Sequence, residues 1–292
     1  VAFICNFIEN IDFQILIPSL NIRIPSTTVI GALEFDKFVE MNNLYDDIYA
    51  LNDYESIRQH FLDSEFDEKI KNRLMSYLEN VKKPLAVRSS GLFEDSLLQP
   101  FSGVYATYLI PNNHPDINER YNQLEMAVKL VYASIFTDSA QAYFDAINYK
   151  IEEEKMAVII QEVVGQKYND KYYPTISGVA QSYNYYPISY MQPEDGFSVA
   201  AVGLGMYVVG GENSFRFCPK YPNLNPTAVS DLLRDSQKYF YAIDLTKTDF
   251  DLIGEGENAA IKKYRIKEAE KDGTLEHSAS TYVMENDELI PG

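Results

Sequence analysis

Short apolar runs of strand length alternate with longer segments of helical period, and this alternation limits the folds open to the chain. Residues 85–87 (LAV), 102–110 (SGVYATYLI) and 156–164 (MAVIIQEVV) are rich in the β-branched and aromatic residues typical of strands. Residues 116–149 lie between the last two runs and repeat apolar side chains at helical spacing. Helical segments come first and strands later, so we expect an α/β or α+β fold with two lobes.

The rest of the chain adds further elements of both kinds. Helices are expected at about residues 1–10, 32–44 and 65–81 and from about 223 onward, and strands at 21–30, 179–190 and 197–209. The strand at 21–30 is interrupted by a proline, which cannot donate a backbone hydrogen bond. These elements fit the same two-lobed fold class.

Composition and charge exclude several classes of protein. The chain has 292 residues, 46% of them hydrophobic, which is enough to bury a sizeable core. With 25 basic and 43 acidic residues its formal charge is −18, so nucleic acid and anionic membranes are not expected as partners. Cys5 and Cys218 lie far apart without CxxC spacing, which argues against a disulfide framework and a zinc site. No apolar run is long enough to span a bilayer, so a cytoplasmic location is expected.

The stretch from Pro84 to Leu109, PLAVRSSGLFEDSLLQPFSGVYATYL, carries the residues that most suggest a binding site. Arg88 follows three apolar residues, so its stem would be anchored in a sheet. Its guanidinium would then project from the strand, where it can hold a phosphate or carboxylate in a bidentate fork. An internal salt bridge to Glu94 or Asp95 is the alternative interpretation.

The residues around this arginine also have two interpretations. Ser102 and Gly103 precede a strand, where glycine lets backbone amides approach a ligand and a hydroxyl adds a donor, but an ordinary tight turn has the same residues. Glu94 and Asp95 could orient Arg88, bind a magnesium ion indirectly or cap the following segment. None of these patterns is specific by itself.

Taken together, the stretch resembles the N-terminal nucleotide-binding domain of the phosphoenolpyruvate synthase and pyruvate phosphate dikinase family. The matching residues follow the family's order and are Arg88, Ser89, Ser90, Glu94, Asp95, Phe101, Ser102, Gly103 and Thr107. Other stretches similar to family segments are IRIPSTTVIGALEFDKFVEMNNL, VYASIFTDSAQA, MAVIIQEVV, ISGVAQSYN and VGLGMYVVGG. The resemblance covers most of the chain up to about residue 220.

This resemblance implies how the ATP phosphates would be held. Arg88 would contact them and stabilise charge on the transferred group, as the catalytic residue of this chain. Ser102, Gly103 and Thr107 would lie near the phosphate tail. ATP and Mg²⁺ are the implied cofactors. The family's phosphate-binding lysine and its acidic magnesium ligands are expected outside the present sequence, before and after it.

The adenine base would be read by the end of the MAVIIQEVV strand. Gln161, Glu162 and Val163 would form this hinge through backbone groups, as the resemblance implies. A hinge strand offers main-chain donors and acceptors, so its side chains can vary while adenine recognition persists. Without the neighbouring matches, the same run would read simply as a core strand.

The resemblance also implies a fold and a division of the chain. The fold class is α/β (α+β), an ATP-grasp-like two-lobed nucleotide-binding domain truncated at both ends. Residues 1–112 would form the N-terminal lobe with the phosphate-binding arginine segment. Residues 113–222 would form the second lobe with the adenine-hinge strand, and residues 223–292 a helical connecting segment.

The implied function is that of the ATP-binding domain of a phosphotransferase. Such a domain would pass a phosphoryl group from ATP to a histidine on a separate domain and then to an acceptor such as pyruvate. His60, His114 and His277 do not match the family's Thr-x-Ser-His context, so none of them is expected to carry the phosphate. This fragment alone is therefore expected to be inactive. Its expected partners are the phosphohistidine and acceptor-binding domains of the full-length protein and a second copy in a homodimer.

Two other classes of function remain open at this point. One is a nucleotide-sensing or regulatory module of the same fold that has lost phosphotransfer. Met206 and Tyr183 favour it, because the family usually has a glutamate and a basic residue there. The other is a structural or partner-binding domain, favoured only by the acidic, tyrosine-rich tract at residues 168–190.

Overall fold

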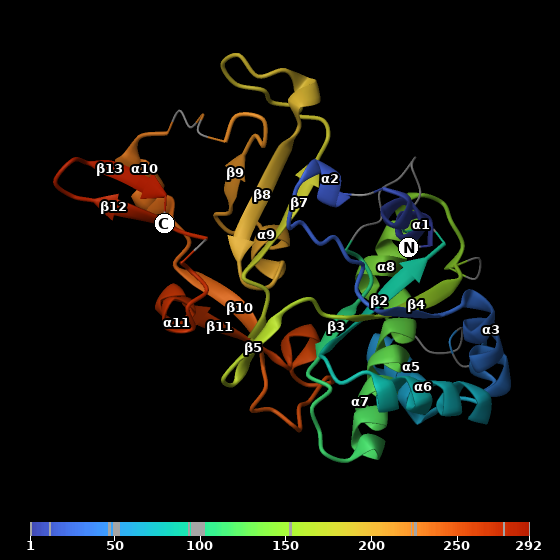
Figure 1. The fold of residues 1–292 in the computed structure, drawn as a ribbon. Coiled ribbons are helices and arrows are strands. Elements are labelled where there is room, and N and C mark those ends of the chain that lie inside the picture. The colour runs from blue at the N-terminus through green and yellow to red at the C-terminus, as the bar shows by residue number, and fades with distance from the viewer. Residues whose placement is uncertain are drawn as a thin grey trace. The chain divides into compact units, whose positions relative to one another are not determined.

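The computed structural model describes residues 2–11, 13–45, 48, 53–92, 94, 103–151, 154–222, 224, 227–276 and 278–291 (Figure 1). The chain divides into two compact units. Unit 1 comprises residues 1–163 with 252–257, and unit 2 comprises residues 164–251 with 258–292. The boundary expected at residue 112 lies within unit 1, and the one expected at 222 lies within unit 2. The division into functional lobes stays a prediction.

Unit 1 is built on a four-stranded antiparallel sheet. In spatial order its strands are β1 (Thr27–Ile30), β4 (Met156–Glu162), β2 (Leu85–Gly91) and β3 (Thr107–Ile110). Each was predicted as a strand, but β1 and β3 are much shorter than expected, β4 ends two residues early and β2 extends to Gly91. β1 begins only after Pro25, which has no N–H to pair, and β3 begins only after the turn at Gly103.

Helices surround this sheet, and side-chain caps mark where several of them begin. They are α1 (Ala2–Asn10), α2 (Phe13–Leu16), α3 (Ala32–Met41), α5 (Tyr54–Asp63), α6 (Glu68–Asn80), α7 (Ile117–Ala133) and α8 (Asp138–Ala146). The Asp67 carboxylate accepts the Ile70 N–H at the start of α6. The helix expected over 116–149 is interrupted by a 3₁₀ turn at Ser134–Phe136, and Thr137 then caps α8.

One face of the sheet is buried against α7, which contacts β2, β3 and β4 (Figure 1). Leu85 and Val87 of β2 and Val158 and Ile160 of β4 are fully buried on this face. A cluster of aromatic rings between the helices extends the core and comprises Phe35, Phe38, Phe61, Phe66, Phe136 and Tyr132. Because side chains alternate along a strand, this burial also fixes which residues point to the opposite face.

Unit 2 consists mainly of small antiparallel sheets in its described part. A four-stranded sheet has the order β11 (Ile261–Arg265), β10 (Tyr239–Asp244), β6 (Lys171–Tyr173), β5 (Gln166–Tyr168). A three-stranded sheet has the order β7 (Ile176–Gln181), β8 (Phe197–Val202), β9 (Phe215–Phe217). The strands β12 (Ser280–Val283) and β13 (Glu288–Pro291) form a two-stranded sheet. Its helices are α9 (Met206–Val209), α10 (Val229–Asp235) and α11 (Ile266–Lys271), with a 3₁₀ turn at Pro193–Asp195. A second 3₁₀ turn, Gly256–Asn258, begins in the segment 252–257 of unit 1 and ends at the first residue of unit 2 after it.

The C-terminal segment differs from the sequence-based expectation. We expected residues 223–292 to be helical, but this segment contains the four strands β10 to β13 besides the short helices α10 and α11. Phe240 and Ala242 are buried at alternate positions of β10, which is the period of a strand. The lysines of β11 stay exposed, so their charge suggested a solvated helix. Residues 206–209, expected as part of a strand, instead form α9.

A buried ion pair lies in unit 2. The Lys171 side chain, from β6, lies 3.1 Å from the Asp272 carboxylate at the end of α11, and both are almost fully buried. The Tyr173 hydroxyl donates to the same carboxylate at 2.8 Å. We expect Asp272→Asn to lower the free energy of unfolding by about 2 kcal/mol, because Lys171 would lose its countercharge in a buried place. Chemical denaturation followed by circular dichroism measures this change.

An exposed ion pair provides the control for this prediction. Glu268 lies 2.8 Å from Lys271 on the surface of α11. Glu268→Gln is expected to leave the unfolding midpoint unchanged, because solvent screens the charges of an exposed pair. If the two substitutions destabilised unit 2 equally, the argument from burial would be wrong.

Candidate functional site

The sheet face opposite α7 carries the predicted phosphate-binding arginine. Leu85, Val87 and Ser89 are buried, whereas Arg88 is exposed, so its side chain lies on the other face of β2. The register places Arg88 directly opposite Thr107 of β3 and Ile159 of β4. Directly opposed residues share a face of the sheet, so Arg88 and Thr107 are brought together there.

Arg88 has no internal partner in the described part of the chain, where its side chain forms no salt bridge or hydrogen bond. Glu94 accepts hydrogen bonds elsewhere, from the Gly91 N–H at 3.1 Å and from the Ser89 hydroxyl at 3.3 Å. Glu94 therefore stabilises the turn after β2, while Arg88 stays available; whether Glu94 also caps the segment that follows stays a prediction. Asp95 lies outside the described residues.

The residues predicted at the phosphate tail are only partly described. Ser102 lies outside the described residues. Gly103 has a φ of +82°, in the left-handed region that favours glycine. The Thr107 N–H donates to the Glu257 carboxylate at 2.8 Å, so Thr107 retains its hydroxyl for a ligand. Glu257, which sequence reasoning did not single out, belongs to the short segment 252–257 of unit 1.

The predicted adenine hinge lies at the far end of β4, and its backbone is already engaged. The Glu162 N–H donates to the Ser26 carbonyl at 2.9 Å, and the Val163 N–H donates to the Pro84 carbonyl at 2.8 Å. The Gln161 side-chain amide donates to the Thr27 hydroxyl at 2.8 Å. The N–H groups of Glu162 and Val163 would have to release the Ser26 and Pro84 carbonyls before they could donate to an adenine base. The hinge role of all three residues stays a prediction.

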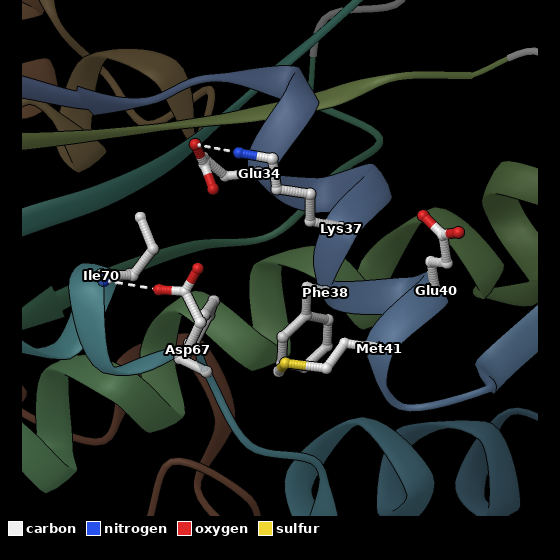
Figure 2. A pocket seen from close by; sticks show the side chains of 8 residues that line it. Glu34, Lys37, Phe38, Glu40, Met41, Asp67 and Ile70 are labelled. Atoms are coloured by element: carbon white, nitrogen blue, oxygen red, sulfur yellow. Dashed lines mark hydrogen bonds and ion pairs between the residues drawn. The ribbon is translucent and has the colours of Figure 1, made fainter.

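A hollow of about 290 Å³ lies between α3 and α6, away from these residues (Figure 2). Its lining residues are Glu34, Lys37, Phe38, Glu40, Met41, Phe66, Asp67 and Ile70. Figure 2 shows Lys37 directed to Glu34, at 2.9 Å, and Asp67 bonded to the Ile70 N–H. Because its lysine is already paired, this hollow is a poor anion site. A second hollow, of about 490 Å³ beside β1, is not lined by Arg88 or Thr107 either.

The described residues contain neither a cluster of metal ligands nor a helix that could span a membrane. Across the described residues, no group of three or more His, Cys, Asp or Glu side chains is placed to hold a metal ion. Mg²⁺, which the resemblance implies, is assigned no ligand among the described residues. The His60 Nδ1–H donates to the Ser56 carbonyl at 2.8 Å within α5, and His277 is not described. None of the helices in the described ranges is long and apolar enough to cross a bilayer.

Comparison with known families identifies the kind of domain that this chain forms. Residues 10–246 match the family described as pyruvate phosphate dikinase, AMP/ATP-binding domain. The chain belongs to this family. The predicted resemblance and the α+β nucleotide-binding fold are thereby confirmed, and the chain is an ATP-binding domain of a family of phosphotransferases.

Relatives of this dikinase-family domain are longer proteins. Phosphoenolpyruvate synthase of Aeropyrum pernix is 29% identical over 222 residues, covering 75% of this chain and 23% of that protein. A probable phosphoenolpyruvate synthase of Staphylothermus marinus is 28% identical over 168 residues, covering 50% and 19%. The uncharacterized phosphotransferase YvkC of Bacillus subtilis is 26% identical over 191 residues, covering 64% and 20%. The chain spans about a fifth of the length of these relatives.

Proposed function

We propose that this chain is the ATP-binding domain of a phosphoenolpyruvate synthase or pyruvate phosphate dikinase-like phosphotransferase, with an ATP-grasp-like fold. The observation that carries the proposal is the unpaired Arg88 guanidinium on an exposed sheet face, directly opposite Thr107. Its planar fork suits a phosphate group.

The proposal assigns one task to Arg88 and another to Gly103. Arg88 would bind the phosphates and neutralise charge that develops during transfer, while Gly103 lets the backbone approach the phosphate tail closely. ATP supplies the phosphoryl group, which would pass to a histidine on a separate domain and then to an acceptor such as pyruvate. Mg²⁺ belongs to the proposal as a cofactor that accompanies ATP, and we assign no step to it. We also propose that the protein pairs with a second copy of itself in a homodimer.

The number of phosphates on the nucleotide provides the test. We expect calorimetry with the 292-residue chain to show the tightest binding for ATP, weaker binding for ADP and AMP, and the weakest for adenosine. Each lost phosphate would remove charge that Arg88 neutralises. Equal affinity for ATP and adenosine, or no binding of either, would exclude the proposed phosphate site.

A second candidate is a nucleotide-sensing module without phosphotransfer. It is favoured by the first residue of α9, Met206, where the family usually has glutamate, and by the engaged N–H groups of Glu162 and Val163. Radiolabelled ATP with the full-length protein separates the two candidates. Labelled phosphohistidine supports the phosphotransferase, whereas ATP binding without any labelled protein supports the sensor.

A further inference from the structure

We propose that Glu154 is a positioning residue for Gly103 and Thr107, because its buried carboxylate joins Leu92, just after β2, to Tyr105, which lies between these two residues in the chain. This inference rests on the proposed function, which places Gly103 and Thr107 at the phosphates. Glu154 lies at the end of a charged run, KIEEEK, and nothing in that run distinguishes it from its neighbours. Only its contacts in the folded chain do so.

The carboxylate of Glu154 receives donors from two places in unit 1. One oxygen, Oε1, accepts the Leu92 N–H at 2.6 Å and the Lys155 N–H at 3.0 Å. The other oxygen, Oε2, accepts the Tyr105 hydroxyl at 2.8 Å. Leu92 directly follows β2, and Tyr105 lies two residues before Thr107, the first residue of β3. A single side chain therefore connects the end of β2 to the residues just before β3.

Burial and close packing against Gly91 fix the hydrogen bond between Glu154 and Tyr105. Glu154 is 3% exposed and Tyr105 is 5% exposed. A Cβ atom added at Gly91 would lie 2.7 Å from the Tyr105 ring, so the ring fits against glycine only. Burial, with Glu154 as the next cause, raises the pKa of the Tyr105 hydroxyl, which therefore stays protonated as a donor. Burying a carboxylate costs free energy, and such polar contacts are retained where they specify one geometry.

The hydrogen bond between Tyr105 and Glu154 affects the phosphate end of the proposed nucleotide site. Tyr105 lies two residues after Gly103 and two residues before Thr107, so a shift of Tyr105 moves both. Gly91 pairs with Met156 at this end of the sheet, whereas Leu85 pairs with Glu162 at the other end. Six residues of β4 separate the two ends by about 20 Å. Glu154 should therefore influence the phosphates and leave the adenosine end unchanged.

Tyr105→Phe tests this inference, because it removes only the hydroxyl and keeps the ring against Gly91. We expect the calorimetric Kd for ATP to rise roughly fivefold, the effect of one hydrogen bond, while the Kd for adenosine stays the same. The matched control is Tyr121→Phe in α7, which is also 5% exposed and also lies beside a carboxylate, Glu125. It should change neither Kd.

Two substitutions at Glu154 complete the test. Glu154→Gln should keep the wild-type ratio of the two Kd values, because its amide can accept from Leu92 and donate to the Tyr105 oxygen. Glu154→Leu should raise the Kd for ATP alone, and if it fails to fold, Tyr105→Phe decides. A Tyr105→Phe variant whose Kd for ATP and adenosine change equally, or not at all, overturns the positioning role while the ATP proposal stands. A wild-type chain that binds ATP no better than adenosine overturns both.

Discussion

Arg88→Ala is expected to weaken ATP binding about 30-fold, with no comparable loss for adenosine. The reason is that a charge-assisted contact is worth about 2 kcal/mol, which is a factor of about 30 in Kd. Arg88 is exposed and has no partner in the described part of the chain, so its removal breaks no internal contact. Calorimetric titration of the variant with ATP and with adenosine measures the effect.

Two further variants separate the guanidinium fork from its charge. Arg88→Lys keeps the positive charge but loses the bidentate geometry, so we expect an intermediate Kd. Arg73→Ala removes an exposed arginine of α6 and should leave the Kd for ATP unchanged. If Arg73→Ala weakened ATP binding as much as Arg88→Ala, the effect would come from net charge and the assignment of Arg88 would be wrong.

Arg120→Met is expected to lower the free energy of unfolding of unit 1 by about 4 kcal/mol. Arg120 is 5% exposed and donates to the carbonyls of Leu78 and Val81, at 2.9 and 2.6 Å, and to the Asn112 side chain at 2.8 Å. Methionine fills a similar volume but removes three hydrogen bonds from a charged donor, each of which is worth about 1.5–3 kcal/mol. The Val81 and Leu78 carbonyls keep other donors, Asn112 and Lys82, so the expected loss lies at the low end of their sum. Burial also lowers the pKa of the guanidinium from its usual value.

Chemical denaturation, monitored by circular dichroism and tyrosine fluorescence, measures this loss. Arg73→Met is the matched control, because it makes the same change at an exposed position of unit 1. Its unfolding midpoint should stay close to that of the wild type. Equal midpoints for Arg120→Met and Arg73→Met would show that the buried contacts at the end of α6 do not stabilise the unit.

Local sequence patterns predicted the strands and helices that form the frame of unit 1. The apolar run before Arg88 and the run MAVIIQEVV became β2 and β4, because β-branched side chains suit a sheet buried on one face. The apolar stripe at 65–81 became α6, which starts at the Asp67 cap. The order of motifs along the chain also sufficed to predict the family, which the match over residues 10–246 confirmed.

The prediction of secondary structure was wrong where charged residues concealed the alternation of apolar residues along a strand. Residues 223–292 looked helical because their exposed lysines and acids suggested a solvated helix. In the folded chain the alternating buried residues of β10 pair with β11, so long-range strand pairing overrides the local composition. No local signal identifies the partner of such a strand.

The sequence by itself determined that an arginine directly follows an apolar run in a nucleotide-binding domain of this family, whereas the structure shows that the strand β2 continues through Arg88 to Gly91. Only the tertiary structure decided which groups surround that arginine. Glu94, six positions away, binds Ser89 and Gly91 instead of Arg88, while Glu154 reaches Leu92 and Glu257 reaches Thr107. The last two contacts join residues 62 and 150 positions apart. Hydrogen bonds over such separations depend on strand register and packing, which are properties of the folded chain as a whole.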